Sequence, residues 1–137
     1  MHPYEDEKVI AGQGTIGLEV YEQIKGLDLI VVPIGGGGLI SGIAVALKTL
    51  NPKIKVIGVQ SVAADSMFQL FKNKQIIEPK INLSTIADGI AIKAPSQKMY
   101  ESFISKYVDY IVTVTEGEIA EAIEFLLERA KSMAEGA

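Results

Sequence analysis

Apolar residues form two long runs in the first half of the chain, separated by four consecutive glycines. The first run, residues 27–34, is continuous, which is typical of a strand covered on both faces in a parallel sheet. Pro33 cannot donate a hydrogen bond to a neighbouring strand, so it belongs at the end of this strand. The second run, residues 39–50, is apolar nearly all round and predicts a buried helix, in which Ser41 and Gly42 allow close approach to the sheet.

Further apolar segments continue this alternation of strands and helices. Residues 54–59 predict the next strand, and a strand, a helix and a strand within this distance imply a right-handed parallel crossover. Open sheets of this kind bind ligands at the carboxyl end of a strand. Residues 64–71 predict a short helix. Residues 76–83 contain Pro79 and predict an edge strand or an irregular connection.

The second half of the chain repeats the pattern. Residues 95–106 predict a helix and residues 109–114 a strand. Thr115 and Glu118 have the spacing of a capping box, which begins an amphipathic helix. The residues predicted to share its apolar face are Ile119, Ile123, Leu126, Ala130 and Met133. The whole pattern predicts an α/β fold, an open and mostly parallel sheet with helices on both faces, in one domain over residues 1–137.

The N-terminal part contains fewer apolar residues. Residues 1–8 predict a loop or a ragged start, and His2, the sole histidine, is expected to be inert. Residues 11–15 contain two glycines and predict a turn. Thr15 is placed to cap a helix over residues 16–24.

Composition and charge narrow the classes of function. With 137 residues, 48% of them hydrophobic, the chain can bury about two-thirds of its unfolded surface. The net charge of −4 argues against a nucleic-acid partner. The absence of cysteine excludes disulfides and thiolate metal sites and fits a reducing cytoplasm. No apolar run approaches the roughly twenty residues of a membrane span, and the polar start does not resemble a signal peptide. We therefore expect a soluble cytoplasmic protein with no metal site.

The four glycines, Gly35, Gly36, Gly37 and Gly38, are the first candidate site. Glycines lose much backbone entropy on folding, so four in a row suggest that side chains must be excluded there. Their amides and the first turn of the following helix can bind a phosphate. No Lys or Arg occurs between Lys25 and Lys48, so backbone dipoles would hold it. The alternative is that these glycines only form a tight turn between strand and helix.

Two nucleotide-binding motifs are excluded by the residues around the glycines. The G-x-G-x-x-G motif fails in both registers, because its last position falls on Ile40 or Ser41. The next strand ends in Gln60, where a dinucleotide-binding fold has a carboxylate for the ribose. A Walker loop would need Lys and Ser or Thr where the chain has Ile43 and Ala44.

A second candidate site is the pair Asp88 and Gly89. From the dipeptide alone, a turn is the simpler interpretation.

Four motifs together resemble one family of enzymes. They are VIAGQGTIGLEV, VVPIGGGGLISGIA, STIADGIA and TVTEGEI, at residues 9–20, 31–44, 84–91 and 113–119. Their order and spacing resemble the threonine dehydratase and serine racemase group of pyridoxal-phosphate (PLP) enzymes of fold type II. The resemblance covers nearly the whole chain. It implies that the chain is part of the large, cofactor-binding domain of such an enzyme.

The resemblance also implies roles for individual residues. The glycine loop Gly35–Gly38, with Leu39, would bind the phosphate of pyridoxal 5'-phosphate. Gly89 would bring backbone close to the pyridine ring, Asp88 would lie near the substrate, and Glu135 would lie near the cofactor ring.

Other elements of the family are missing from this chain. The S-x-K-x-R-G-like motif that carries the Schiff-base lysine does not occur, and neither does the serine that contacts the pyridine nitrogen. The lysines that do occur are expected on helix surfaces or in turns. We therefore expect a fragment without the small domain and without a catalytic residue of its own, which binds PLP weakly at best.

For the intact parent, the resemblance implies β-elimination of L-threonine or L-serine to a 2-oxo acid and ammonia. Racemases of this group carry acidic cation ligands at positions that here are Gln60, Ala64 and Ser66, so two carboxylates are absent. This favours a threonine dehydratase over a serine racemase. The alternative from another class is a stand-alone module that binds phosphate or another anion, or a protein partner, without catalysis. Exposed apolar faces would make the chain self-associate into a homo-oligomer.

Overall fold

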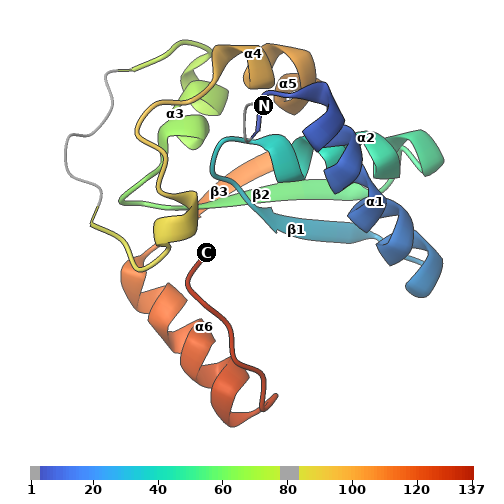
Figure 1. Ribbon diagram of the computed structural model, residues 1–137. Coiled ribbons are helices and arrows are strands. Elements are labelled where there is room, and N and C mark those ends of the chain that lie inside the picture. Colours follow the sequence, from blue (N-terminus) through green and yellow to red (C-terminus); the bar gives the residue numbers. More distant parts are fainter. Residues whose placement is uncertain (1–3, 78–83) are drawn as a thin grey trace.

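The computed structural model describes residues 4–77 and 84–137, and its centre is a three-stranded parallel sheet (Figure 1). The strands are β1 (Leu29–Pro33), β2 (Lys55–Ser61) and β3 (Tyr110–Val114), in the spatial order β1-β2-β3. Val31 pairs with Ile57, which pairs with Tyr110. The predicted α/β class and the parallel crossover are confirmed, and Pro33 ends β1 as expected.

Helices connect the strands. The longer α-helices are α1 (Glu7–Gln23), α2 (Gly38–Leu50), α3 (Ser66–Asn73) and α6 (Glu116–Glu128). A continuous helical stretch consists of α4 (Gln97–Met99), the π-helical η2 (Tyr100–Ile104) and α5 (Ser105–Tyr107), and a short 3₁₀ turn, η1, spans Asp88–Ile90. None of the helices in the described ranges is both long and apolar enough to cross a membrane.

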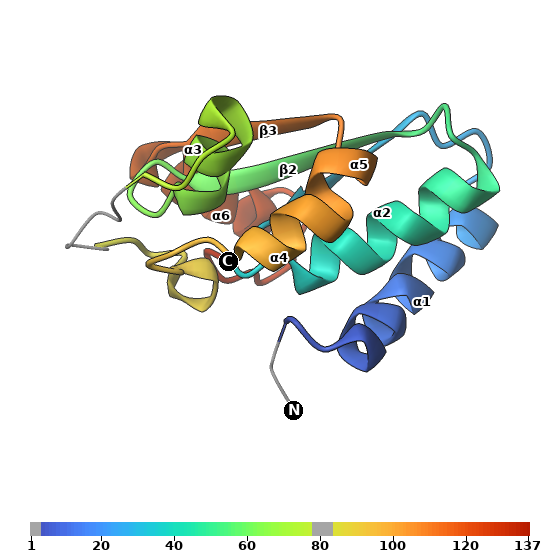
Figure 2. The same ribbon diagram turned by 90° about the horizontal axis from the view of Figure 1, so that it is seen from above.

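The core lies on one side of the sheet. Figures 1 and 2 show α1 to α5 gathered on this side, whereas α6 lies on the other. Val32, Val56 and Ile111 point into the core from the three strands. The buried helical side chains opposite them come from α2, α3 and η2, namely Ile40, Ile43, Leu47, Met67, Leu70 and Ile104.

The other side of the sheet is largely open. Leu29 and Val31 are 49% and 55% exposed, and Tyr110 and Val112 are 58% and 44% exposed. Because side chains alternate along a strand, these residues share the face opposite the core. The prediction that residues 27–34 are covered on both faces is therefore wrong for this chain. Helices do lie on both sides, but α6 faces the carboxyl ends of the strands across a cavity rather than covering the middle of the sheet.

The first helix begins earlier than predicted. α1 starts at Glu7, where the Asp6 side chain accepts from Lys8 N at 2.9 Å, so the predicted turn at residues 11–15 and the cap at Thr15 are wrong. The glycines that suggested a turn lie inside the helix. A Cβ at Gly14 would lie 3.2 Å from the Gly42 carbonyl oxygen, so α1 and α2 pack backbone against backbone. Gly42 thus faces α1, not the sheet as predicted.

Smaller differences concern the ends of the elements. The short helix begins at Ser66 rather than near residue 64, and α6 ends at Glu128, so Ala130 and Met133 do not belong to its apolar face. Met133 is 92% exposed. The capping box of α6 is confirmed, with Thr115 and Glu118 bonded in both directions. Of the segment predicted as an edge or irregular connection, residues 78–83 lie outside the described residues, as does His2.

Candidate functional site

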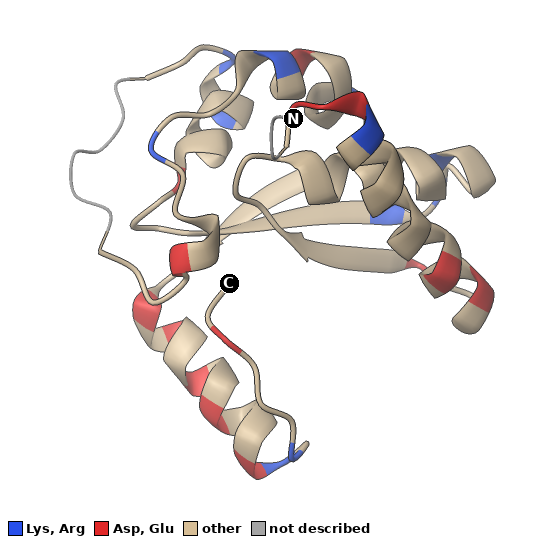
Figure 3. Cartoon of the chain, in the orientation of Figure 1, with Lys and Arg blue, Asp and Glu red and all other residues tan. Residues whose placement is uncertain are grey.

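The glycine loop lies between the carboxyl end of β1 and the first turn of α2. Gly37 is the N-cap of α2 and has a left-handed backbone with φ of +97°, which favours glycine. As a glycine it makes no side-chain capping bond, so the N-cap residue itself leaves the first amides of α2 uncapped. Figure 3 shows no charged residue in this loop or in the first turn of α2. The loop therefore offers backbone donors and the positive end of a helix dipole.

Each of the four glycines has a close neighbour within the protein. A Cβ at Gly35 would lie 3.2 Å from Ile90 Cα, and one at Gly37 would lie 2.9 Å from Ile104 Cδ1. At Gly36 a Cβ would overlap the Tyr4 ring, and at Gly38 it would lie 3.0 Å from Tyr4 Cα. Part of the requirement for glycine is thus internal packing and not only space for a ligand.

A cavity of about 290 Å³ remains above the loop. Its lining includes all the glycines of the loop together with Leu39, Gly89 and Tyr4. Gly89 comes from η1, which follows more than forty residues later in the sequence, so the fold brings the two predicted cofactor-binding segments together. Asp88, predicted beside the substrate, is exposed next to Gly89 and does not line this cavity.

Tyr4 is the residue of this site that sequence reasoning missed. It falls in the stretch predicted as a ragged start, yet it is half-buried against the glycine loop. The available signal was an aromatic side chain in an otherwise polar segment, because an aromatic ring usually buries much of its area.

A second cavity, of about 220 Å³, adjoins the first and shares Pro33 and Ile90 with it. Ala87 and Glu135 also line it. Glu135 is exposed and reaches this place because the chain after α6 folds back toward η1. A Cβ on the neighbouring Gly136 would lie 2.5 Å from the Ile86 carbonyl oxygen. The predicted ring-binding residues Gly89 and Glu135 therefore line two cavities that meet.

Gln60 has a structural role at the end of β2. Its side chain is fully buried, donates to the Ile34 carbonyl at 3.0 Å and accepts from Phe68 N at 2.9 Å. The Ser66 hydroxyl donates to the Ile92 carbonyl at 3.1 Å. Gln60 and Ser66, at two of the positions where the family resemblance predicted the absence of cation ligands, make contacts within the protein instead. Within residues 4–77 and 84–137, no group of three or more His, Cys, Asp or Glu side chains could hold a metal ion.

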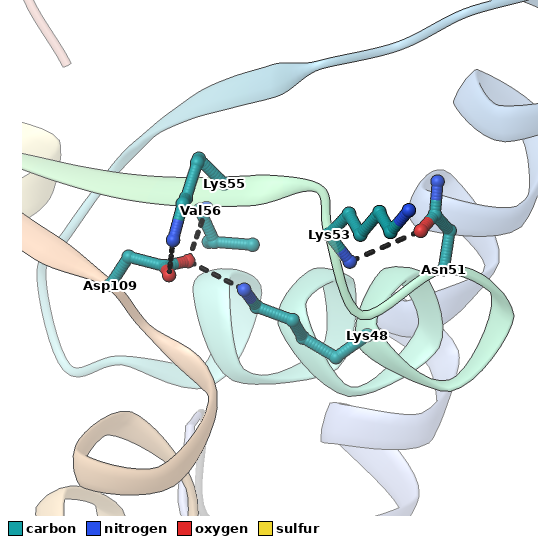
Figure 4. Close-up of polar contacts among 6 residues, drawn as sticks. All are labelled: Lys48, Asn51, Lys53, Lys55, Val56 and Asp109. Atoms are coloured by element: carbon teal, nitrogen blue, oxygen red, sulfur yellow. Dashed lines mark hydrogen bonds and ion pairs between the residues drawn. The ribbon is translucent and has the colours of Figure 1, made fainter.

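The clearest lysine cluster lies at the opposite end of the sheet (Figure 4). The Asp109 carboxylate accepts from Lys48 Nζ at 2.6 Å, Lys55 Nζ at 2.9 Å and Val56 N at 2.9 Å. Burial raises the pKa of Asp109, but the hydrogen bonds from Lys48, Val56 and Lys55 outweigh it and lower that pKa to about 2. Lys55 begins β2 and Asp109 precedes β3, so this cluster joins the amino ends of the strands. Neither cavity is lined by a lysine of the described residues.

The loop residues fit a phosphate-bearing ligand. A phosphate held by backbone donors requires a helix start that its own N-cap residue does not cap, an uncharged lining and free volume, and the loop provides all three. An adjoining cavity with a more apolar lining could take a planar ring. The described residues do not supply a lysine that could react with an aldehyde at this position.

Comparison with known proteins gives consistent matches over the whole chain. The family model "Pyridoxal-phosphate dependent enzyme" matches residues 1–137. L-threonine ammonia-lyase of Thermotoga maritima is 52% identical over 139 residues, which are 100% of this chain and 34% of that protein. Among solved structures, a serine racemase of Dictyostelium discoideum superposes with a TM-score of 0.88 at 38% identity, over 99% of this chain and 42% of that one. A threonine deaminase of T.th. gives a TM-score of 0.92 at 35% identity, over 98% and 50% of the two chains.

Proposed function

Because the chain belongs to the pyridoxal-phosphate dependent enzyme family, we propose that it is the glycine-loop part of a threonine ammonia-lyase. The chain spans only 34% and 39% of the lengths of two curated relatives, an L-threonine ammonia-lyase and an L-threonine dehydratase. The reaction of the longer protein would be β-elimination of L-threonine or L-serine to a 2-oxo acid and ammonia. The observation that carries the proposal is the cavity in which Gly35–Gly38 and Gly89 meet.

The chain's own residues would bind and orient the cofactor. The amides of Gly35–Gly38 and Leu39 would bind its phosphate, and the backbone at Gly89 would lie along one side of its ring. Glu135 would lie beside the ring from the second cavity. Asp88, which follows the buried Ala87 and precedes Gly89, would approach the substrate, as the family resemblance implies. When bound, PLP supplies an electron sink for negative charge at the α-carbon of an amino acid. The apolar side chains around both cavities would limit the access of water.

We expect the 137-residue chain alone to be inactive. PLP chemistry needs a lysine that reacts with the cofactor aldehyde, and no described lysine lines either cavity. The chain as proposed is a single but incomplete PLP-binding domain, whose lysine belongs to another part of the longer protein.

Two alternatives are supported by specific observations. The similarity to a serine racemase at 38% identity favours a racemase parent, but Gln60 and Ser66 stand at positions where racemases carry acidic cation ligands. A stand-alone phosphate-binding module is favoured by the missing lysine. The reading frame upstream of this sequence distinguishes part of an enzyme from a stand-alone module. An S-x-K-x-R-G-like motif there would support an enzyme.

The proposal extends to partners and location. The acidic net charge of −4 does not suit a nucleic-acid partner, and the absence of cysteine agrees with the reducing cytoplasm. The exposed apolar face of the sheet supports self-association into a homo-oligomer.

The test is an absorption titration of the purified chain with PLP, followed by borohydride reduction and peptide mapping. We expect saturable binding that is weak, is competed by inorganic phosphate and is absent with pyridoxal, which lacks the phosphate. Lysine modification should be slow and scattered. A saturable imine that maps to one lysine would contradict the inactive-fragment proposal, and equal binding of pyridoxal would contradict the role of the glycine loop.

A further inference from the structure

Glu116, the first residue of α6, connects two segments that are distant in sequence. Its Oε1 accepts a hydrogen bond from the Ser61 hydroxyl at the end of β2, and its Oε2 accepts from Ile86 N at 2.7 Å. Ser61 is 1% exposed, and its hydroxyl oxygen also accepts from Ala63 N at 3.0 Å. The carboxylate is thus bound to a rigid sheet end on one side and to an irregular segment on the other.

The segment bound by Glu116 leads directly into the candidate site. Ala87, the next residue after Ile86, is fully buried, and its carbonyl accepts from Ile90 N at 3.2 Å. Ile90 then lies against Gly35, and Gly89 lines the cavity over the glycine loop. Anchoring Ile86 therefore determines where η1 reaches the loop.

Glu116 is not required to cap its own helix. Thr115 and Glu118 form the capping box, in which Glu118 Oε2 accepts from Thr115 N at 2.7 Å. Hydrogen bonds from Ser61, Ile86 and Thr85 lower the pKa of Glu116, so its carboxylate is ionised at neutral pH. A charged acceptor of this kind makes stronger hydrogen bonds than a neutral one.

We propose that Glu116 is a positioning residue that holds residues 85–90 against the glycine loop and so sets the affinity of the cofactor site. The identity of the ligand rests on the proposed function, whereas the positioning role rests on the contacts of Glu116 with Ser61 and Ile86.

The test compares Glu116→Gln with Glu118→Gln in the full 137-residue chain, without ligand, by hydrogen exchange read out by mass spectrometry. We expect E116Q to raise amide exchange in residues 84–92 by about tenfold or more, the order expected for losing a hydrogen bond to a charged group. E118Q lies in the same turn and should raise exchange only at the start of α6. Unchanged exchange of residues 84–92 in a folded E116Q protein would overturn the proposal.

A second variant covers the case in which E116Q does not fold. Ser61→Ala removes the anchor of the carboxylate but leaves its charge, so a smaller rise of exchange in residues 84–92 is expected. No rise in S61A would overturn the proposal in that case.

Binding of PLP is the second measurement, and its control is Glu121→Gln, because Glu121 is an exposed residue of α6 that lines neither cavity. We expect E116Q to weaken PLP binding severalfold and E121Q to leave it unchanged. If the wild-type chain does not bind PLP at all, the proposed function fails while the exchange result still decides the role of Glu116. If E116Q loosens residues 84–92 but binds PLP as the wild type does, the claim that Glu116 sets the affinity is overturned.

Discussion

At the candidate site, the side chains around the four glycines fill the space that side chains at those positions would need. The ring of Tyr4 occupies the space that a side chain at Gly36 would fill, and Ile90 and Ile104 do the same at Gly35 and Gly37. A backbone without side chains is therefore required by the protein's own packing before any ligand arrives. The same feature leaves the amides of the loop uncovered by side chains of its own.

Gly36→Ala tests this match. The added Cβ would overlap the Tyr4 ring, so Tyr4 must move, and we expect the free energy of unfolding to fall by about 1–3 kcal/mol. Gly117→Ala is the matched control, because the nearest atom to its Cβ would be 3.9 Å away. Urea unfolding followed by circular dichroism measures both. Equal stability of the G36A protein and the wild type would show that Tyr4 does not pack on the loop in solution.

At the scale of elements, α1 and α2 are held together by an unusually close crossing. Gly42 of α2 lies against the backbone of Ile10 and Gly14 in α1, so neither helix has a side chain at the crossing point. At the amino ends of the strands, the Asp109 carboxylate connects β3 to α2 and β2. It accepts hydrogen bonds from Lys48 of α2 and from Lys55 and Val56 of β2. The position of α2 is thus fixed by close backbone packing against α1 and by the ion pair between Lys48 and Asp109.

Gly42→Ala tests the helix crossing. Its Cβ would lie 2.6 Å from Gly14 N, which is backbone and cannot rotate away. We expect a loss of about 1–3 kcal/mol in the free energy of unfolding. Gly12→Ala, in the interior of α1 with no atom within 4 Å of its Cβ, should instead stabilise the chain by up to about 1 kcal/mol. Denaturant titrations of the two variants should move in opposite directions, and parallel shifts would contradict the packing role.

Asp109→Asn tests the hydrogen bonds and ion pairs of Asp109 at the amino ends of the strands. The pKa of Asp109 is lowered to about 2 in the folded chain, below its ordinary value of 3.8. Its contribution to stability is therefore fully present above about pH 4 and is lost as the pH falls through about 2. We expect D109N to lower the free energy of unfolding by about 1–3 kcal/mol at pH 7 and to remove this part of the acid dependence.

Unfolding at pH 7, 4 and 2 measures the effect of Asp109→Asn. Asp28→Asn is a suitable comparison, since Asp28 is an exposed aspartate at the same end of the sheet. An unchanged slope of stability against pH in D109N would show that the carboxylate contributes little.

At the scale of the whole molecule, one face of the sheet determines how the chain should behave in solution. Val31 of β1 and Tyr110 and Val112 of β3 lie on either side of the partly buried Ile57 and Val59 of β2, so the register of the parallel strands places apolar side chains of all three strands on this face. The edges of β1 and β3 are also unpaired within the described residues. Surfaces of this kind favour association.

Val112→Lys tests association through this face. We expect the wild-type chain to sediment as oligomers at high concentration, and V112K to shift toward the monomer because a charge on the face must be desolvated on association. Ile24→Lys is the control, since Ile24 is similarly exposed, at 51%, beyond the end of α1. A monomeric wild type at every concentration would contradict the proposal of self-association.

Features that depend on residues close together in the sequence could be predicted, and features that depend on distant residues could not. Hydrophobic pattern and turn residues depend on near neighbours, so β1, the glycine loop, α2 and the capping box at Thr115 were predictable, and the four motifs were enough to identify the family. The helical start at Glu7 was not, because Gly12 and Gly14 look like turn residues until the backbone of α2 is placed beside them.

The three strands, most of the helices and their order could thus be predicted from the sequence, as could the candidate residues Gly35–Gly38 and, through the family resemblance, Gly89. Three contacts became visible only in the folded chain: Tyr4 on the glycine loop, Ile90 against Gly35, and Glu116 with Ser61 and Ile86. Each of these contacts joins residues that are dozens of positions apart in the sequence. The parallel order of the strands brings their carboxyl ends to one edge, but which side chains meet there depends on segments that no local pattern of residues connects.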